Sequence, residues 1–422
     1  MDDSIKFTGL PNPCGVGEYG VKENAKKLLR FLYFHQQLML IGCGQLPARA
    51  DWELKQGIGR HAYEDGMAAS ALRIRITELR TPAHSLGKLS DPLMELFFDE
   101  LIHVRSDLEF SVLIYGFVKP ELLRIYRDYI RKTQQIVDHP TVRMLRPIIW
   151  DLEEQTAWGE RMIAHLKAKE SLDPDQEQYI DYLKDIVQTA GGFDANGDKS
   201  FVFPDRRRSH TPYVLPAKSI RDSSMGPSVS YRTGMGIPFD NPDQEALADM
   251  MRIRQEEMGA AETIAGVIYS QKGMDWEFYT DLARHLWDEI RHTMLGQAAL
   301  EAEGYNWRSR PQFVSDYNFV FPKVPAVRYA WLSLGVEEKA MKRPGKVGEY
   351  EFCRDVVKHP LMTLFQDYDW ADEVVHAQLG RKWTPAMFDE NLETIRGIAL
   401  PLAAEKLDYQ QQLKNSRDTN PK

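Results

Sequence analysis

The chain has 422 residues, of which 43% are hydrophobic and 27% charged, so it is long enough for two domains with full cores. Its net charge of −9, with acidic and basic residues interspersed, argues against nucleic acid or an anionic membrane as its partner. No apolar run approaches the length of a membrane span, and the N-terminal residues show no signal-peptide pattern. Cys14, Cys43 and Cys353 lie far apart, which fits a reducing compartment, and we expect a cytoplasmic protein.

Helical patterns dominate the chain. Apolar residues recur with a helical period in segments rich in Leu, Ala, Met, Glu and Arg, whereas strand-like alternation is scarce. The stretch 191–242 differs, because Gly, Ser, Pro and Asp crowd together there in a long connection. The sequence therefore predicts an all-α protein with a break between two halves. The expected helical segments are 22–41, 54–80, 91–117, 141–170, 243–271, 276–303, 325–341 and 361–380.

The two halves share spaced motifs. An Asp-Trp-Glu triplet, followed after a fixed gap by Arg-His, begins at Asp51 and again at Asp275, an offset of 224. A second block, which begins with His-Pro at His139 and at His359, repeats with an offset of 220. Such self-similarity indicates a tandem duplication of one helical unit. We therefore expect two tandem four-helix bundles, at residues 1–190 and 243–400, with an irregular linker or insert at 191–242 and a C-terminal tail at 401–422.

Two Glu-x-x-His pairs lie in the last third of the chain, Glu289 with His292 and Glu373 with His376. At positions i and i+3 of a helix, a carboxylate and an imidazole project from the same face, so each pair can give one metal an oxygen and a nitrogen ligand. Four-helix bundles with dinuclear sites combine two such pairs with one further Glu from each of the other two helices. The sequence thus predicts a dinuclear metal centre in the second bundle.

The first half lacks both imidazoles. In the register of the repeat, Asp65 stands for Glu289 and Glu153 for Glu373, but Ala68 and Thr156 replace the two histidines. A metal site does not survive that loss. We therefore expect residues 1–190 to form a degenerate bundle without a metal site, in a structural or dimerising role, and a homodimer is one arrangement that this role allows.

A third carboxylate is expected on the helical segment that precedes the first Glu-x-x-His pair. The segments 243–271 and 276–303 are joined by a short turn around Lys272, so they should pack antiparallel. A ligand at the depth of Glu289 must then lie about as far before the turn as Glu289 lies after it. Both Glu256 and Glu257 satisfy this condition, and the helical phase does not choose between them.

The fourth carboxylate should precede the second pair. Glu338 lies about as far before Glu373 as Glu256 lies before Glu289, and Glu337 is next to it. The sequence Arg-Pro-Gly-Lys at 343–346 interrupts the connection, so this position stays open, with Glu349 and Glu351 as alternatives.

This set of residues resembles the ligands of the ferritin-like di-iron carboxylate superfamily, which includes ferritins, ribonucleotide reductase small subunits, arylamine N-oxygenases and bacterial multicomponent hydroxylases. The resemblance covers roughly residues 243–380 and is to a superfamily pattern rather than to one family. It implies a cofactor of two iron ions, with manganese as an alternative, since carboxylate-rich sites with two histidines suit these redox metals.

His285 departs from the superfamily pattern. It lies four residues before Glu289, on the same helical face, and could be an extra ligand as in the arylamine oxygenases. Its counterpart His61 persists in the half that lost its site, which favours a structural hydrogen-bonding role instead. No catalytic residue beyond the metal ligands and no other cofactor site stands out.

The resemblance implies an oxidase or oxygenase that activates O2 and acts on a small organic substrate, with hydroxylation, N-oxygenation and desaturation all open. An electron-donor protein is a further expected partner. One alternative is a ferroxidase or iron-handling protein without an organic substrate. The other is a metal-free scaffold or binding protein.

Overall fold

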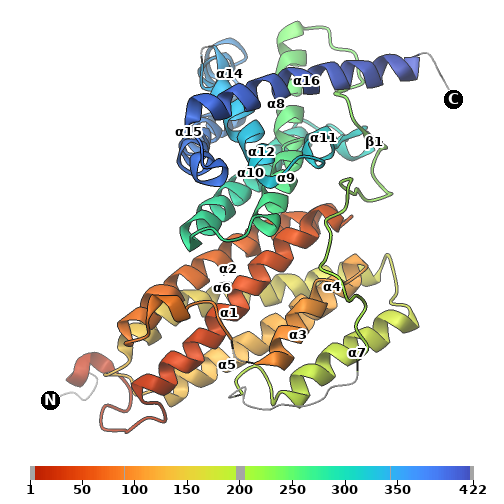
Figure 1. Cartoon of the computed structure of the whole chain (residues 1–422). Coiled ribbons are helices and arrows are strands. Elements are labelled where there is room, and N and C mark those ends of the chain that lie inside the picture. The colour runs from red at the N-terminus through yellow and green to blue at the C-terminus, as the bar shows by residue number, and fades with distance from the viewer. Residues whose placement is uncertain (1–4, 90, 196–204, 343, 419–422) are drawn as a thin grey trace. The chain divides into compact units, whose positions relative to one another are not determined.

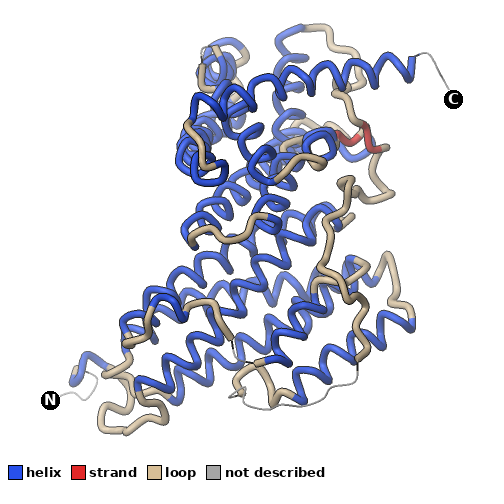
Figure 2. Tube along the Cα trace, viewed as in Figure 1, coloured by secondary structure: helices blue, strands red, loops and turns tan. Residues whose placement is uncertain are grey.

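The computed structural model describes residues 5–89, 91–195, 205–342 and 344–418, most of which are helical (Figures 1 and 2). This confirms the expectation of an all-α protein. Strands among these residues are limited to β1 (Ser228–Val229) and β2 (Gln312–Phe313), which pair in parallel. In the part of the chain that the structure describes, no helix combines the length and apolar character that crossing a bilayer requires.

The chain divides into two compact units. The first comprises Met1–Ile41 and Glu64–Val214, and the second comprises Gly42–Tyr63 and Leu215–Lys422. The segment 42–63, expected in the first domain, thus groups with the second. It contains the end of helix α1 (Val21–Gln45) and the start of helix α2 (Trp52–Glu78).

The first unit holds most of α1 and α2 and a series of shorter helices. The segment expected as one helix over 91–117 is broken, because Asp91 accepts a hydrogen bond from the backbone N–H of Met94 and Ser106 from that of Glu109, so each residue caps a new helix. Its other elements are η1 (Lys6–Gly9), η3 (Ala83–Ser85), α3 (Pro92–Leu101), α4 (Asp107–Leu113), the π-helix η4 (Ile114–Val118), α5 (Lys119–Lys132), α6 (His139–Lys167) and α7 (Pro174–Thr189).

Aromatic side chains fill the core of the first unit. The ring of Phe34 lies 5.4 Å from that of Phe98 and 5.3 Å from that of Phe193, centroid to centroid, and all three residues are buried. Phe193 belongs to the segment 191–242, which was expected as a linker; its residues 196–204 lie outside the described part of the chain. The start of this segment therefore contributes to the core of the first unit.

The second unit places its longest helices against one another. Helices α8 (Pro242–Gln255) and α9 (Met258–Ser270) pack on α10 (Trp276–Ala302), and α10 packs on α15 (Pro360–Phe388). Its remaining elements are η2 (Leu46–Ala48), η5 (Trp307–Ser309), α11 (Ser315–Val320), α12 (Pro325–Ala330), the π-helix η6 (Trp331–Glu337), α13 (Glu338–Ala340), α14 (Gly345–Glu351), the π-helix η7 (Phe352–Val356) and α16 (Leu392–Asp418). Residues 401–418, expected as a tail, continue helix α16.

Glycines allow the closest helix contacts of this unit. A Cβ atom at Gly296 of α10 would lie only 2.1 Å from the backbone nitrogen of Gln255, at the end of α8. The helix expected over 243–271 is interrupted at that point, so that Glu256 ends α8 and Glu257 begins α9. The glycine therefore brings the α8–α9 junction against α10.

Candidate metal centre

Two helices of the second unit each present three metal-ligand side chains on one face. Positions i, i+4 and i+7 of a helix lie on the same side, and both helices use this spacing. The residues are His285, Glu289 and His292 on α10 and Asp369, Glu373 and His376 on α15, and all six are buried.

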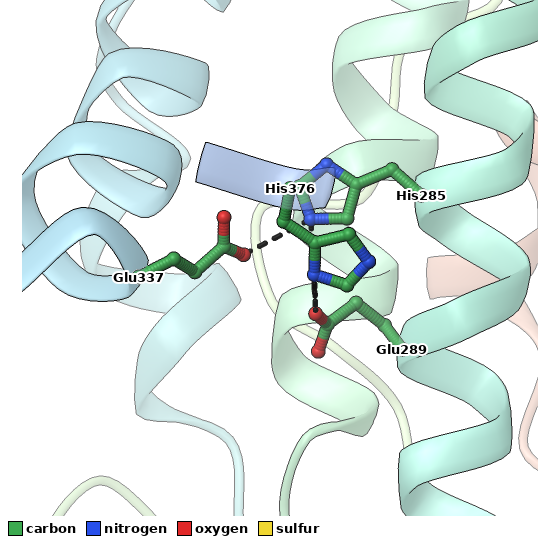
Figure 3. A group of neighbouring side chains, drawn as sticks. All are labelled: His285, Glu289, Glu337 and His376. Carbon is green, nitrogen blue, oxygen red and sulfur yellow. Dashed lines mark hydrogen bonds and ion pairs between the residues drawn. The ribbon is translucent and has the colours of Figure 1, made fainter. Parts of the chain in front are cut away.

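The first group of potential ligands is His285, Glu289, Glu337 and His376, and one donor atom of each lies within 4.8 Å of the others (Figure 3). Glu337, the last residue of the π-helix η6, places Oε1 3.0 Å from Nε2 of His285. Nδ1 of His376 lies 3.3 Å from Oε1 of Glu289. The rings of His285 and His376 are stacked with centroids 3.8 Å apart.

The second group is Glu257, His292, Asp369 and Glu373, with donor atoms at the same close range. Nδ1 of His292 lies 3.4 Å from Oε2 of Glu257 and 3.5 Å from Oδ1 of Asp369. The two groups adjoin, because Oε1 of Glu289 is 3.9 Å from Nδ1 of His292 and Oε2 of Glu373 is 3.9 Å from Nδ1 of His376. The carboxylates of Glu289 and Glu373 therefore lie between the groups.

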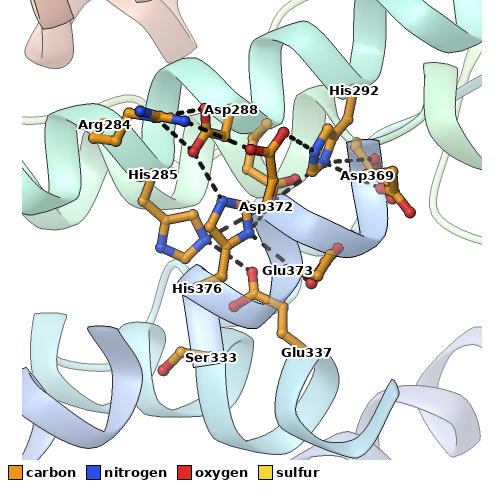
Figure 4. A network of polar contacts seen from close by, with 12 residues as sticks. Arg284, His285, Asp288, His292, Ser333, Glu337, Asp369, Asp372, Glu373 and His376 are labelled. Carbon is orange, nitrogen blue, oxygen red and sulfur yellow. Dashed lines mark hydrogen bonds and ion pairs between the residues drawn. The ribbon is translucent and has the colours of Figure 1, made fainter. Parts of the chain in front are cut away.

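Two aspartates orient the imidazoles in a crossed arrangement (Figure 4). Asp288, next to Glu289 on α10, lies 3.4 Å from Nε2 of His376 on α15. Asp372, next to Glu373 on α15, lies 3.4 Å from Nε2 of His292 on α10. An imidazole that donates its Nε2–H to a carboxylate keeps its Nδ1 lone pair for a metal, and this partner fixes both the ring and its tautomer. His285 is turned the other way, with Nδ1 3.3 Å from the Tyr329 hydroxyl and Nε2 toward the carboxylates.

Two arginines connect the orienting aspartates. Nε of Arg284 donates to Asp288 at 2.8 Å, and Arg291 donates to Asp288 and, at 2.6 Å, to Asp372. Burial alone would raise the pKa of the Asp288 carboxyl. The hydrogen bonds from His376 and Arg291 lower the pKa by more than burial raises it, so that it lies below its usual range. Asp288 is therefore ionised and able to accept from His376.

The carboxylates around the site raise the pKa values of His376 and His292. Burial lowers the pKa of His376, but Asp288 and Glu289 raise it to about 10. His292 is shifted in the same direction, because Asp369, Asp372 and Glu257 outweigh the effect of burial. Without a metal, protonated imidazoles thus compensate the carboxylates. A bound metal would displace those protons.

The donor atoms that face the middle of the two groups are left without hydrogen bonds. Buried polar atoms are normally hydrogen-bonded, so each exception needs a reason. Six atoms of these side chains are buried and form no hydrogen bond with the described residues: Oε2 of Glu257, Nδ1 of His292, Oε2 of Glu337, Oδ1 of Asp369, Oε2 of Glu373 and Nδ1 of His376. A cation in each of the two groups would give these atoms a partner, so the residues fit a dinuclear metal centre.

Basic side chains hold the outer oxygens of the second group. Nζ of Lys346, on α14, donates to Oδ2 of Asp369 at 2.8 Å and to Oε1 of Glu373 at 2.9 Å. Arg254 donates to Oε1 of Glu257, and its Nη1 also lies 3.3 Å from Oδ1 of Asp369. Oε2 of Glu257 and Oδ1 of Asp369 lie near Nδ1 of His292, and Oε2 of Glu373 lies near Nδ1 of His376.

Not every residue expected at the site lies there. The structure brings together Glu257, His285, Glu289, His292, Glu337, Glu373 and His376, and it leaves out Glu256 and Glu338. Glu256 faces away because it ends α8, and both of its oxygens accept from Arg252 at 2.8 Å. Glu338 follows Glu337 by one residue, which turns it outward to accept from Arg381 and Arg396. Glu349 pairs with Arg254 outside the groups.

The sequence offered a signal for one residue that we did not predict. Asp369 stands four residues before Glu373, as His285 stands before Glu289, so the spacing of the first motif could have identified it. The aspartates at 288 and 372, each directly before a ligand Glu, could have been found in the same way. No local pattern marks Lys346.

Comparisons of the chain with family models, with curated proteins and with solved structures find no match. The resemblance to the ferritin-like superfamily therefore rests on the residues of this chain alone.

Proposed function

We propose that the second unit holds two metal ions, one in each group of side chains, and that the protein is a di-iron oxidoreductase of the ferritin-like type, with manganese as the alternative metal. Position one would be formed by His285, Glu289, Glu337 and His376, and position two by Glu257, His292, Asp369 and Glu373. The observation that carries the proposal is the set of six buried donor atoms without hydrogen bonds, all belonging to these residues.

Two iron ions in such a ligand set would supply electrons for the reduction of O2. The chain itself contributes orientation and charge. Asp288, Asp372 and Tyr329 hold the three imidazoles with one nitrogen inward, and the carboxylates of Glu289 and Glu373 each lie near a histidine of the other group. Burial of these side chains excludes bulk water from the centre.

An organic substrate is supported by a cavity of about 430 Å³ lined by residues that precede and follow Glu337 in the chain. Its lining consists of Leu334, Glu338, Lys339, Met341, Lys342, Arg381, Arg396 and Leu400, and Glu338 accepts hydrogen bonds from Arg381 and Arg396. Lys339 and Lys342 beside the apolar Leu334, Met341 and Leu400 suit an organic anion better than a ferrous ion. We therefore favour oxidation of a small organic molecule, with an electron-donor protein as the source of electrons.

A ferroxidase is the second candidate function. A cavity of about 410 Å³, lined among others by Asp243, Glu303 and His359, has the acidic and polar lining that a ferrous ion would need. Neither cavity is lined by any of the eight proposed ligands, so the order of the two functions rests on the residues that line the cavities, and we place this function second.

We further propose that the chain arose by tandem duplication and that the first unit is the copy without a metal site. Helices α2 and α10 have the same length, and their bounds differ by the repeat offset of 224. Asp65, the counterpart of Glu289, accepts from the ammonium of Lys119 at 2.7 Å and lies 2.8 Å from Nδ1 of His35. An internal cation thus neutralises the carboxylate that a metal would bind in the other copy. The three cysteines are thiols, in keeping with the cytoplasmic location that we propose.

Metal analysis of the full chain, produced with added iron, tests this proposal. We expect about two metals per chain, and Glu373→Ala should remove at least one of them. Glu153→Ala is the matched control, because Glu153 is the counterpart of Glu373 but pairs at the surface with Arg127, so its loss should leave the metal content unchanged. A wild-type chain that binds no metal would falsify the proposal.

Rapid mixing of the reduced, metal-loaded protein with O2 separates the two candidate functions. An oxidase or oxygenase should show an optical transient whose decay is accelerated by small organic anions. A ferroxidase should consume added Fe(II) at the same rate with and without such compounds.

A further inference from the structure

Lys346 is a buried cation whose only hydrogen bonds from Nζ in the described part of the chain go to two proposed metal ligands. The residue is 5% exposed, and its ammonium bonds to Asp369 and Glu373 at 2.8 and 2.9 Å. The bonds go to Oδ2 of Asp369 and Oε1 of Glu373. The other oxygens, Oδ1 of Asp369 and Oε2 of Glu373, are among the six without hydrogen bonds.

The start of helix α14 places this lysine at the site. Helix α14 begins at Gly345, directly before Lys346, and a Cβ atom at Gly345 would lie 1.9 Å from the backbone oxygen of Ala340. Only glycine allows the chain to approach helix α13 this closely. The close approach at Gly345 therefore lets the side chain of the next residue, Lys346, enter the site.

The two positions differ in how their carboxylates are compensated. All three carboxylates of position two have a basic partner: Arg254 bonds to Glu257, and Lys346 bonds to Asp369 and Glu373. In position one, Glu289 and Glu337 form ion pairs only with histidines among the described residues. The ammonium of Lys346 donates to Oδ2 of Asp369 and Oε1 of Glu373, so it stands within a few ångströms of a cation bound to the other oxygens of these carboxylates and repels it.

We propose that Lys346 makes the two metal positions unequal, so that position one fills first and position two binds its metal more weakly. This inference rests on the proposed function, since it requires both positions to bind a metal. A divalent cation within a few ångströms of a fixed ammonium loses about tenfold or more in affinity even at a high effective dielectric constant. The protein would then pass through a state with one metal over a range of metal concentrations.

Titration of the metal-free full chain with Mn(II), with free Mn(II) counted by electron paramagnetic resonance, tests the proposal. The wild type should bind two equivalents, the second about tenfold or more weakly than the first. In Lys346→Met, which keeps the length of the side chain without its charge, the second equivalent should bind about tenfold more tightly and the first should be unchanged. Lys346→Arg keeps the charge and should retain the weak second step.

Lys358→Met is the control for loss of a nearby lysine, because Lys358 is exposed and lines neither of the two cavities, and it should leave both steps unchanged. Asp369→Asn assigns the steps, since it should affect the weak equivalent and spare the tight one. Two equal steps in the wild type, or a weaker second step in Lys346→Met, would overturn the inference while leaving the dinuclear site intact. If Lys346→Met does not fold, the wild-type and Asp369→Asn titrations still decide the order of filling. A wild type that binds no Mn(II) and no iron would refute the proposed function itself.

Discussion

Replacing Gly296 by alanine should separate helices α10 and α8 and destabilise the second unit. The new Cβ atom would lie 2.1 Å from the backbone nitrogen of Gln255, 2.6 Å from the carbonyl oxygen of Met251 and 2.7 Å from the carbonyl carbon of Arg254. Non-bonded carbon atoms normally approach to about 3.5 Å, so the helices must move apart by roughly 1 Å. Overpacking of this kind costs about 1–3 kcal/mol, and backbone atoms cannot rotate away, which favours the upper end of this range.

Alanine also regains about 1 kcal/mol of helix propensity, which leaves a net loss of about 2 kcal/mol in the free energy of unfolding. For a unit of this size the melting temperature should fall by about 4–8 °C. Thermal unfolding monitored by circular dichroism measures this shift. Because the α8–α9 junction carries Glu257, the variant should also lose part of its second metal equivalent.

Gly397→Ala is the matched control. Gly397 lies within helix α16 and is exposed, and a Cβ atom there would contact nothing within 4 Å, so only the gain in helix propensity should remain. That variant should be slightly more stable than the wild type. If Gly296→Ala were stabilised to the same extent, the close contact between α10 and α8 that we describe would be refuted.

Three further predictions concern the buried carboxylates of the two units. Glu289→Gln should abolish binding of at least one metal, whereas Asp65→Asn, at the corresponding position of the first unit, should leave the metal content unchanged. Asp65→Asn should lower the free energy of unfolding by about 3–5 kcal/mol, because it leaves Lys119 without its partner. Metal analysis and chemical unfolding would check both results, and equal metal loss in the two variants would contradict our assignment. Asp372→Asn should weaken metal binding about 10- to 100-fold, because His292 loses the acceptor of its Nε2–H, and an unchanged Mn(II) titration would show that packing alone orients the ring. The first unit should lose stability as the pH falls from about 7 to 4. Burial raises the pKa of Asp65, but Lys119 and His35 lower it below its usual value, and burial lowers the pKa of His35, so the unfolded state binds more protons than the folded state below about pH 6.5. His35 should contribute a slope of up to about 1.4 kcal/mol per pH unit below about pH 6.5, and Asp65 should add to it only as the pH approaches about 4, as measured from urea midpoints; a flat profile would count against this reasoning.

Local patterns in the sequence are sufficient to predict features that depend on a single continuous helix. Each of α2, α10 and α15 is a continuous amphipathic helix, and the helical period predicts most of their ends to within a few residues; the end of α15 is the exception. The same period places Glu289 with His292, and Glu373 with His376, on one face. It does not predict the breaks at 102–106 and 256–257, because the first depends on side-chain caps and the second lies at a close contact with Gly296, far away in the chain.

The choice between neighbouring carboxylates shows the limit of this reasoning. Glu256 and Glu257 differ by one residue, and so do Glu337 and Glu338, so that each choice depends on the local rotation of the backbone. In both cases the backbone departs from a regular α-helix: Glu257 begins a new helix after a break, and Glu337 ends a π-helix. A wide turn with an extra residue shifts the phase of all later side chains relative to a regular helix. Extrapolation of a 3.6-residue period across such a segment cannot identify the inward-facing member of a pair.

Lys346 is a further residue of the site that a helical period cannot predict. Its position depends on the close approach of Gly345 to Ala340 at the start of helix α14. A break that ends one helix and starts another at a different angle can bring in a side chain that no helical pattern connects with the site. The ammonium at this position adds to a difference in composition, since the first group has two carboxylates and two imidazoles and the second has three carboxylates and one imidazole. The irregular segments of this unit thus supply Lys346, Glu257 and Glu337, whereas the two Glu-x-x-His pairs follow the helical repeat.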